Sequence, residues 1–95
     1  MCLLEIYAEV RLKDDIVDML LERRLNDFFY FVCDKYASRT LLQTSREQVS
    51  GRKEYGVFRI FVDYDSADEL SRAMYKEYQR EGVRCYLMDN IKEMP

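Results

Sequence analysis

The sequence contains no histidine. Histidine is the commonest general base and the commonest metal ligand in proteins, so its absence disfavours the chemistries that depend on an imidazole. No apolar run approaches the roughly 20 residues that a transmembrane helix needs. The apolar start MCLLEIYAEV has no basic region before it and contains charged residues, so a signal peptide is not expected. We therefore expect a cytoplasmic protein.

Cysteine is scarce and widely spaced. The three cysteines are Cys2, Cys33 and Cys85, and no CxxC pair occurs. All three fall in apolar, strand-like runs. Buried free thiols in a reducing compartment are the simplest interpretation, with a metal or redox role as the alternative.

The charge is unevenly distributed along the chain. The net charge of −3 argues against broad binding to nucleic acid. Five basic and two acidic residues lie between Lys35 and Glu54, a charge of +3 that leaves −6 for the remainder of the chain. The pattern predicts a basic segment on an acidic body.

The apolar residues define six segments of regular structure. Alternating or short continuous apolar runs predict strands, and apolar residues at helical spacing predict helices. Strands are expected over Cys2–Val10, Phe28–Cys33, Val57–Tyr64 and Val83–Met88, and helices over Lys13–Leu25 and 66–82. This order predicts a single domain over residues 1–95 with an α+β, ferredoxin-like βαββαβ fold. Its four-stranded antiparallel sheet would carry both helices on one face.

The helix ends carry recognisable capping residues. Asn26 is a candidate C-terminal cap for the first helix. Ser66 and Glu69 have the spacing of a capping box at the start of the second helix, and Gly82 is expected to end it. Asp63 and Asp65 flank a strand end, where turn and capping roles explain them.

The sheet face opposite the two expected helices is too apolar to be left in contact with water. It is expected to collect Leu3, Glu5, Tyr7, Arg59, Phe61, Arg84, Tyr86 and Met88. Such a patch usually marks an interface, and the residues assigned to an oligomer interface are Leu3, Tyr7, Arg59, Phe61, Tyr86 and Met88. In the alternative interpretation, the aromatic side chains stack RNA bases. The absence of an RNP-like run and the acidic body favour self-association.

The connection of about residues 36–55 is too long for an ordinary hairpin turn, which needs two to five residues. Loops of this length in small domains are functional or disordered. Candidate ligand-binding residues in it are Arg46, Glu47, Gln48, Gly51, Arg52 and Lys53. The two final cations could hold an anionic ligand or an acidic partner. A solvated connection whose charges keep the protein soluble is the alternative. In a third interpretation, Leu41, Leu42 and Val49 pack the connection onto its own sheet or onto a neighbour.

Three stretches resemble a known family. They are Val17–Glu22 (VDMLLE), Ser45–Arg52 (SREQVSGR) and Val57–Val62 (VFRIFV), and the final strand at Val83–Met88 accompanies them. With the element order and the long connection, the chain resembles the PII-like signalling proteins, and within them a short PII-like family of unknown function. The resemblance implies a homotrimer whose sheets line the centre and whose connections, the T-loops, project outward. It also implies ligands in clefts between subunits at the base of that loop.

The resemblance also implies a biological setting. Genes of the similar family often lie beside heavy-metal efflux pumps, which implies a regulatory or metal-related role and a membrane transporter or efflux component as a possible partner. ATP binding of the usual PII kind is not expected, because the segment before the last strand, Arg80–Val83, has one glycine and no lysine. A CutA-like copper protein is the alternative. Without histidine, its metal would need Cys33, Asp34 or Glu47.

No constellation for catalysis stands out. Asp14, Asp15 and Asp18 cluster at a helix start, where the helix dipole explains them. We therefore predict a non-enzymatic regulatory or sensor protein. It would bind an unidentified small ligand or metal between subunits and signal to a partner protein through the connection.

Overall fold

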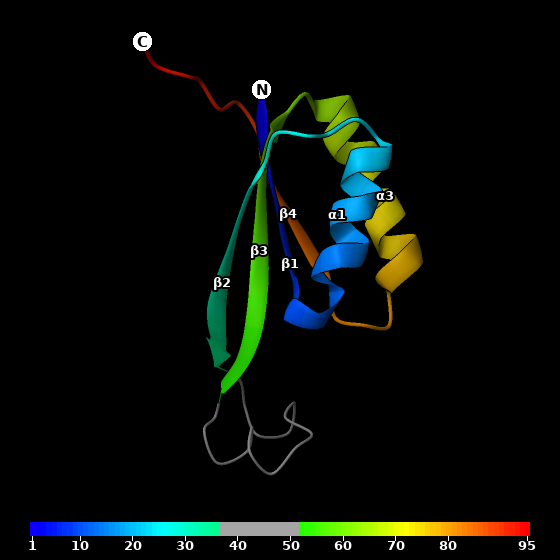
Figure 1. Ribbon diagram of the computed structural model, residues 1–95. Helices are drawn as coiled ribbons and strands as arrows, with labels where there is room; N and C mark the ends of the chain where they lie inside the picture. The colour runs from blue at the N-terminus through cyan, green and yellow to red at the C-terminus, as the bar shows by residue number, and fades with distance from the viewer. Residues whose placement is uncertain (37–51) are drawn as a thin grey trace.

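The structure is a computed structural model that describes residues 1–36 and 52–95. The elements are β1 (Cys2–Glu9), a 3₁₀ turn η1 (Val10–Leu12), α1 (Lys13–Glu22), β2 (Phe29–Tyr36), β3 (Arg52–Val62), α3 (Tyr64–Tyr78) and β4 (Arg84–Met88). The strands form one antiparallel sheet in the order β2-β3-β1-β4. Both helices cover the same face of it (Figure 1). The predicted ferredoxin-like α+β fold is confirmed.

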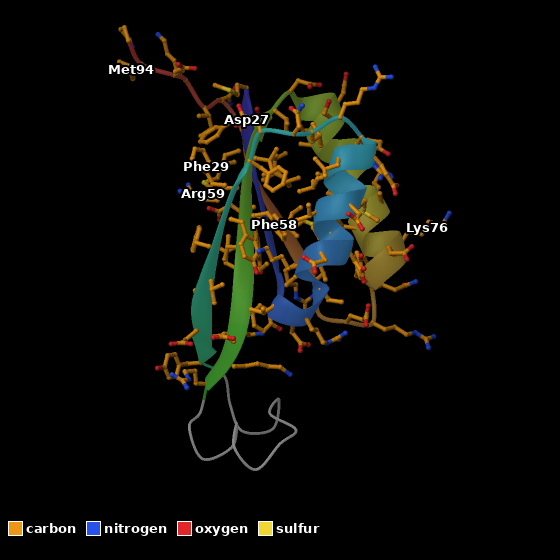
Figure 2. All side chains as sticks on the ribbon, in the orientation of Figure 1. Asp27, Phe29, Phe58, Arg59, Lys76 and Met94 are labelled. Atoms are coloured by element: carbon orange, nitrogen blue, oxygen red, sulfur yellow. The ribbon has the colours of Figure 1, made fainter. Side chains whose placement is uncertain are left out.

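The core lies between the sheet and the two helices. Alternate residues of β1 and β3 point toward the helices and meet the apolar stripes of α1 and α3. The largest of these side chains is Phe58, whose ring lies 4.6 Å from the Tyr30 ring and 5.8 Å from the Phe28 ring between centroids. Figure 2 shows Phe58 on the helical side of the sheet.

Two strands are longer than predicted. The ladder between β2 and β3 continues from Val32 opposite Gly56 to Tyr36 opposite Arg52. The alternation of apolar and polar residues did not predict these additions, because most of the added residues are charged, and Asp, Glu and Lys are uncommon in strands. Of the expected 36–55 connection, the ends lie in strands, and residues 37–51 lie outside the described part of the chain.

Helix α1 ends earlier than predicted, and Asn26 does not cap it. Arg24 adopts a left-handed conformation with φ of 61°. Its N–H donates to the Leu21 carbonyl at 2.9 Å, and the Leu25 N–H donates to the Leu20 carbonyl at 3.0 Å. This pair of hydrogen bonds is a Schellman motif with an arginine in the place that glycine usually takes.

No helix within residues 1–36 and 52–95 has the length and apolarity to cross a membrane.

Helix α3 begins two residues earlier than the expected capping box. Asp63 is the N-cap: its carboxylate accepts the Ser66 backbone N–H at 3.1 Å and the Ser66 hydroxyl at 2.7 Å. Ser66 therefore lies inside the first turn and donates to the N-cap residue, so it is not the N-cap itself. The helix ends at Tyr78, and Gly82 follows with φ of 74° in the connection to β4.

The N-cap makes a pH-dependent contribution to stability. The hydrogen bonds from the Ser66 hydroxyl and backbone N–H lower the pKa of Asp63. The pKa of Asp63 is therefore lower in the folded protein than in the unfolded chain, where an aspartate has a pKa of about 3.9. The resulting stabilisation is fully present above that unfolded pKa, and it is lost as the pH falls through the folded pKa. Asp63→Ala should lower the melting temperature at pH 7 by about 5 °C. The difference should shrink toward zero when thermal melts followed by circular dichroism are repeated at decreasing pH.

Asp63→Asn is the matched control, because asparagine caps helices about as well as aspartate without titrating in this range. It should keep most of the stability and lose the acid dependence. An unchanged melting temperature for Asp63→Ala at pH 7 would contradict the capping role.

Candidate functional site

The sheet face opposite the helices, called the open face, is formed by side chains of all four strands. Residues paired across an antiparallel ladder point to the same side. The register therefore collects Leu3, Glu5, Tyr7, Glu9, Phe29, Phe31, Cys33, Lys35, Lys53, Tyr55, Val57, Arg59, Phe61, Arg84, Tyr86 and Met88. All eight residues predicted for this face lie on it. Figure 2 shows Phe29 and Arg59 on the side of the sheet away from the helices.

The open face exposes large apolar side chains. Phe29 is 64% exposed and Phe61 45% exposed, and Phe31, Tyr86 and Met88 are exposed beside them. Leu3, predicted as an interface residue, is instead covered within the chain, between Phe61 and Met88 on the neighbouring strands. This much exposed aromatic surface is typical of an interaction face.

The sequence interpretation missed Phe29 and Phe31 as members of this face. They belong to the run FFYFVC, in which nearly every residue is apolar or aromatic. Period-two alternation cannot assign faces in such a run. The register with β3 does so, because Phe29 lies opposite Arg59 and Phe31 opposite Val57.

A pocket of about 350 Å³ lies at the end of the sheet where β2 ends and β3 begins. We call it the open-face pocket, and it is lined by Tyr7, Cys33, Asp34, Lys35, Tyr55, Arg84 and Tyr86. Its residues come from all four strands, so the sheet register assembles it. Its two cations and three phenol rings, with the acidic residue Asp34 beside them, have the chemistry that suits a small anion with a flat or apolar part.

Ring contacts hold the pocket side chains in place. The Tyr7 and Tyr86 rings pack edge to face, with 5.6 Å between centroids. The Lys35 ammonium lies 4.9 Å from the centre of the Tyr55 ring. Tyr55 is buried, which fixes the ring that the ammonium covers. Both contacts therefore rest on aromatic side chains, whose few rotatable bonds limit their freedom.

A polar network continues from the pocket along the open face. The Tyr7 hydroxyl donates to Glu5 Oε1 at 3.0 Å, and this hydrogen bond, with burial, raises the pKa of Tyr7. The other carboxylate oxygen, Oε2, lies 3.0 Å from Arg59 Nε, without the alignment of a hydrogen bond. Glu5 therefore ties the pocket wall at Tyr7 to β3.

The two cations predicted at the end of the connection lie on opposite faces. Lys53 is on the open face, with its ammonium 3.3 Å from Glu9. Arg52 is on the other side, 3.8 Å from the Asp34 carboxylate. The remaining ligand-binding candidates, Arg46, Glu47, Gln48 and Gly51, lie outside the described residues. The structure instead brings Lys35 and Arg84 into one pocket, which only the register could reveal.

The cysteines are free thiols in different surroundings. Cys2 is buried and its thiol donates to Asp89 Oδ1 at 3.1 Å, and burial raises the pKa of Cys85 to about 11. Cys33 lines the open-face pocket. Among residues 1–36 and 52–95, no three carboxylate or thiol side chains come close enough to share a metal ion. The metal candidate Glu47 lies outside those residues.

Comparison with known proteins identifies the class. The chain combines a four-stranded antiparallel sheet, two helices on one face and a long connection between β2 and β3, an arrangement that it shares with the PII-like structures compared below. It belongs to the family described as protein of unknown function (DUF3240), whose profile matches residues 1–94. No curated protein matches the sequence.

Three solved structures share the fold. A DUF3240 family protein from Shewanella baltica OS155 has a TM-score of 0.72 and 21% identity, over 99% of this chain and 93% of that one. A putative PII-like signalling protein from Thermus thermophilus has a TM-score of 0.69 and 17% identity, over 92% and 83%. CPII, a nitrogen regulatory PII-like protein from Thiomonas intermedia K12 bound to ADP, AMP and bicarbonate, has a TM-score of 0.74 and 14% identity, over 99% and 93%. At these identities the likeness concerns the fold.

Proposed function

We propose that this chain is a non-enzymatic regulatory protein that binds a small anionic ligand in the open-face pocket. The ligand would lie between subunits of a homotrimer, at the base of the connection between β2 and β3. Binding would change that connection, which then engages a partner protein. The observation that carries the proposal is the pocket itself, where Lys35 and Arg84 meet three tyrosines near the end of β2 and the start of β3.

The position of the pocket supports coupling between ligand and connection. Lys35 and Tyr55 lie near the ends of the two strands that lead into the connection, and both line the pocket. A ligand held by these side chains would favour one arrangement of the two strand ends. Ligand affinity that differs between two arrangements of a segment is what shifts its population.

The exposed aromatic side chains of the open face support assembly. Phe29, Phe31 and Phe61 lie on the same face as the pocket, so a second subunit seated there would border it. A neighbouring subunit would close the open side of the pocket and remove water from its charges. Electrostatic contacts to an anion become stronger when water is excluded.

Isothermal titration calorimetry tests the proposal with bicarbonate, inorganic phosphate, AMP, ADP and cyclic nucleotides as probes. At least one anion should bind, and Arg84→Ala or Lys35→Ala should weaken it by about tenfold or more, since each removes a charged contact. Lys76→Ala is the matched control: it removes an exposed cation from α3, on the far side of the molecule (Figure 2), and should leave the affinity unchanged.

Two results would contradict the proposal. One is the absence of binding for every anion at millimolar concentration. The other is equal affinity for the unaltered protein and for Arg84→Ala and Lys35→Ala. Parallel titrations of the Arg52→Ala and Lys53→Ala variants show whether the first residues of β3 also contribute.

A further inference from the structure

Glu5 places a negative charge on the open face beside a pocket that is proposed to bind an anion. Its side chain is only 15% exposed, and it comes from β1, two residues before the pocket residue Tyr7. A carboxylate at this position should repel an anion, and a carboxylate that is mostly covered is costly unless it is paired. Its charge therefore has to be balanced if the pocket is to work, and the contacts of its two oxygens show how.

The two oxygens of the Glu5 carboxylate have different partners. Oε1 accepts a hydrogen bond from the Tyr7 hydroxyl at 3.0 Å. Oε2 lies 3.0 Å from Nε of Arg59, the residue directly opposite Glu5 on β3. The Arg59 N–H is not aligned for a hydrogen bond to this oxygen, so Arg59 acts on Glu5 chiefly through its charge. One oxygen thus holds a pocket side chain while the other faces a cation.

The hydrogen bond to Glu5 fixes the direction of the Tyr7 ring. This ring is held at two points, because its hydroxyl donates to Glu5 and its edge or face packs on Tyr86, with 5.6 Å between the ring centroids. Tyr86 lies directly opposite Glu5 on β4. Side chains that line a binding site work best when their neighbours lock them in place. Glu5 is therefore placed to set the geometry of the pocket wall without lining the pocket itself.

The charges of Glu5 and Arg59 act on the pocket wall in opposite directions. The hydrogen bond to Glu5 and burial raise the pKa of Tyr7, and the Glu5 charge raises it further, whereas the Arg59 charge lowers it. The positive charge of Arg59 therefore offsets the negative charge of Glu5 at Tyr7. Without Arg59, the pocket would keep its own two cations and would face an unbalanced carboxylate.

We propose that Glu5 and Arg59 form a charge-balanced positioning pair for the open-face pocket. Glu5 orients Tyr7, and Arg59 cancels the repulsion that Glu5 would exert on a bound anion. The inference rests on the proposed function, because it concerns the anion that the pocket binds. It adds to the site two residues that do not line it. It also makes a distinctive prediction: losing Arg59 alone should weaken anion binding more than losing both charges together.

Isothermal titration calorimetry with bicarbonate, inorganic phosphate, AMP, ADP and cyclic nucleotides tests the inference. Arg59→Gln should weaken binding of the tightest of these anions by about fivefold, because Glu5 is left unbalanced. Glu5→Gln/Arg59→Gln should return to within about twofold of the unaltered protein, because the pair is neutral again and an amide oxygen still accepts from Tyr7. This recovery is the informative result, since a second substitution would not restore a contact that was needed only for packing.

Arg23→Gln is the matched control. Arg23 Nε lies 3.1 Å from the Glu69 carboxylate, an ion pair of the same kind in the helical layer, on the other side of the sheet. The control removes the same charge and should keep the affinity within about twofold, because a distant exposed charge is screened by salt. The deficit of Arg59→Gln relative to the unaltered protein should also shrink in high salt, which screens an unbalanced charge and does not replace a lost packing contact.

Failure of this inference can be distinguished from failure of the proposed function. If none of the anions binds the unaltered protein, both are overturned. If an anion binds and Arg59→Gln binds it equally tightly, or if the double variant stays as weak as Arg59→Gln, the inference about the pair is overturned and the pocket stands. The same holds if sedimentation velocity shows that the affinity loss of Arg59→Gln accompanies a loss of assembly.

Discussion

A Phe61→Glu variant is expected to sediment as a folded monomer, whereas the unaltered chain is expected to sediment as a homotrimer. Phe61 lies on the open face opposite Leu3 and is 45% exposed in the single chain. The fold therefore tolerates a change at this position. In the assembled protein the new carboxylate would be buried without a partner, at a cost of several kcal/mol per subunit. Three such sites in one trimer would abolish assembly.

Sedimentation velocity measures the effect directly, with circular dichroism to verify the fold. Tyr75→Glu is the matched control, because Tyr75 is 71% exposed on α3, which lies on the opposite side of the sheet. It introduces the same charge and should remain trimeric. A trimeric Phe61→Glu variant would exclude the open face as the interface, and a monomeric unaltered protein would exclude the trimer itself.

The sequence was informative about which residues face which side of the sheet. In β1 the alternation of Leu4 and Ile6 with Glu5 and Tyr7 was enough, because one face meets the helices and the other does not. The same logic correctly placed Arg59 and Tyr86 on the open face. Where that contrast disappears, as in FFYFVC, the sequence could not separate the faces.

Helix ends were less predictable because several residues near each end can satisfy the same backbone groups. Both Asp63 and Ser66 have side chains suited to an N-cap. The choice falls on Asp63 because β3 ends at Val62 and the chain turns immediately into α3. At the end of α1, Arg24 takes the left-handed position although Asn26 is better suited to it. These outcomes depend on where the neighbouring strands lie.

The candidate pocket could not be predicted from the sequence. Lys35, Tyr55 and Arg84 are distant along the chain, and each has an ordinary role when considered alone. They share a pocket because β1 places β3 and β4 on its two sides, and β2 pairs with the outer edge of β3. Sequence patterns indicate which face of the sheet a residue lies on. Which residues of the four strands meet in one pocket depends on the order and register of strand pairing.

Gly56→Val is expected to lower the free energy of unfolding by about 3 kcal/mol, the upper part of the range for inserting volume into a packed site. Gly56 does not have a positive φ, so its backbone conformation alone would accept other residues. Space is what excludes them, because the Tyr30 side chain lies directly over the glycine and a Cβ there would overlap its ring and hydroxyl. Tyr30 cannot easily move, since its ring packs on Phe58 and lies beneath the Lys13 ammonium, 4.9 Å from the ring centre.

A double-mutant cycle in urea shows whether this contact causes the loss. In a Tyr30→Ala background, Gly56→Ala should be neutral or stabilising, because the ring that clashes is absent and alanine is less flexible than glycine in the unfolded chain. With Tyr30 present, Gly56→Ala should be destabilising. Tyr30→Phe should cost little, since the buried Tyr30 hydroxyl has no hydrogen-bond partner among the described residues. Equal effects of Gly56→Ala in both backgrounds would show that the glycine is needed for a reason other than the space that Tyr30 occupies.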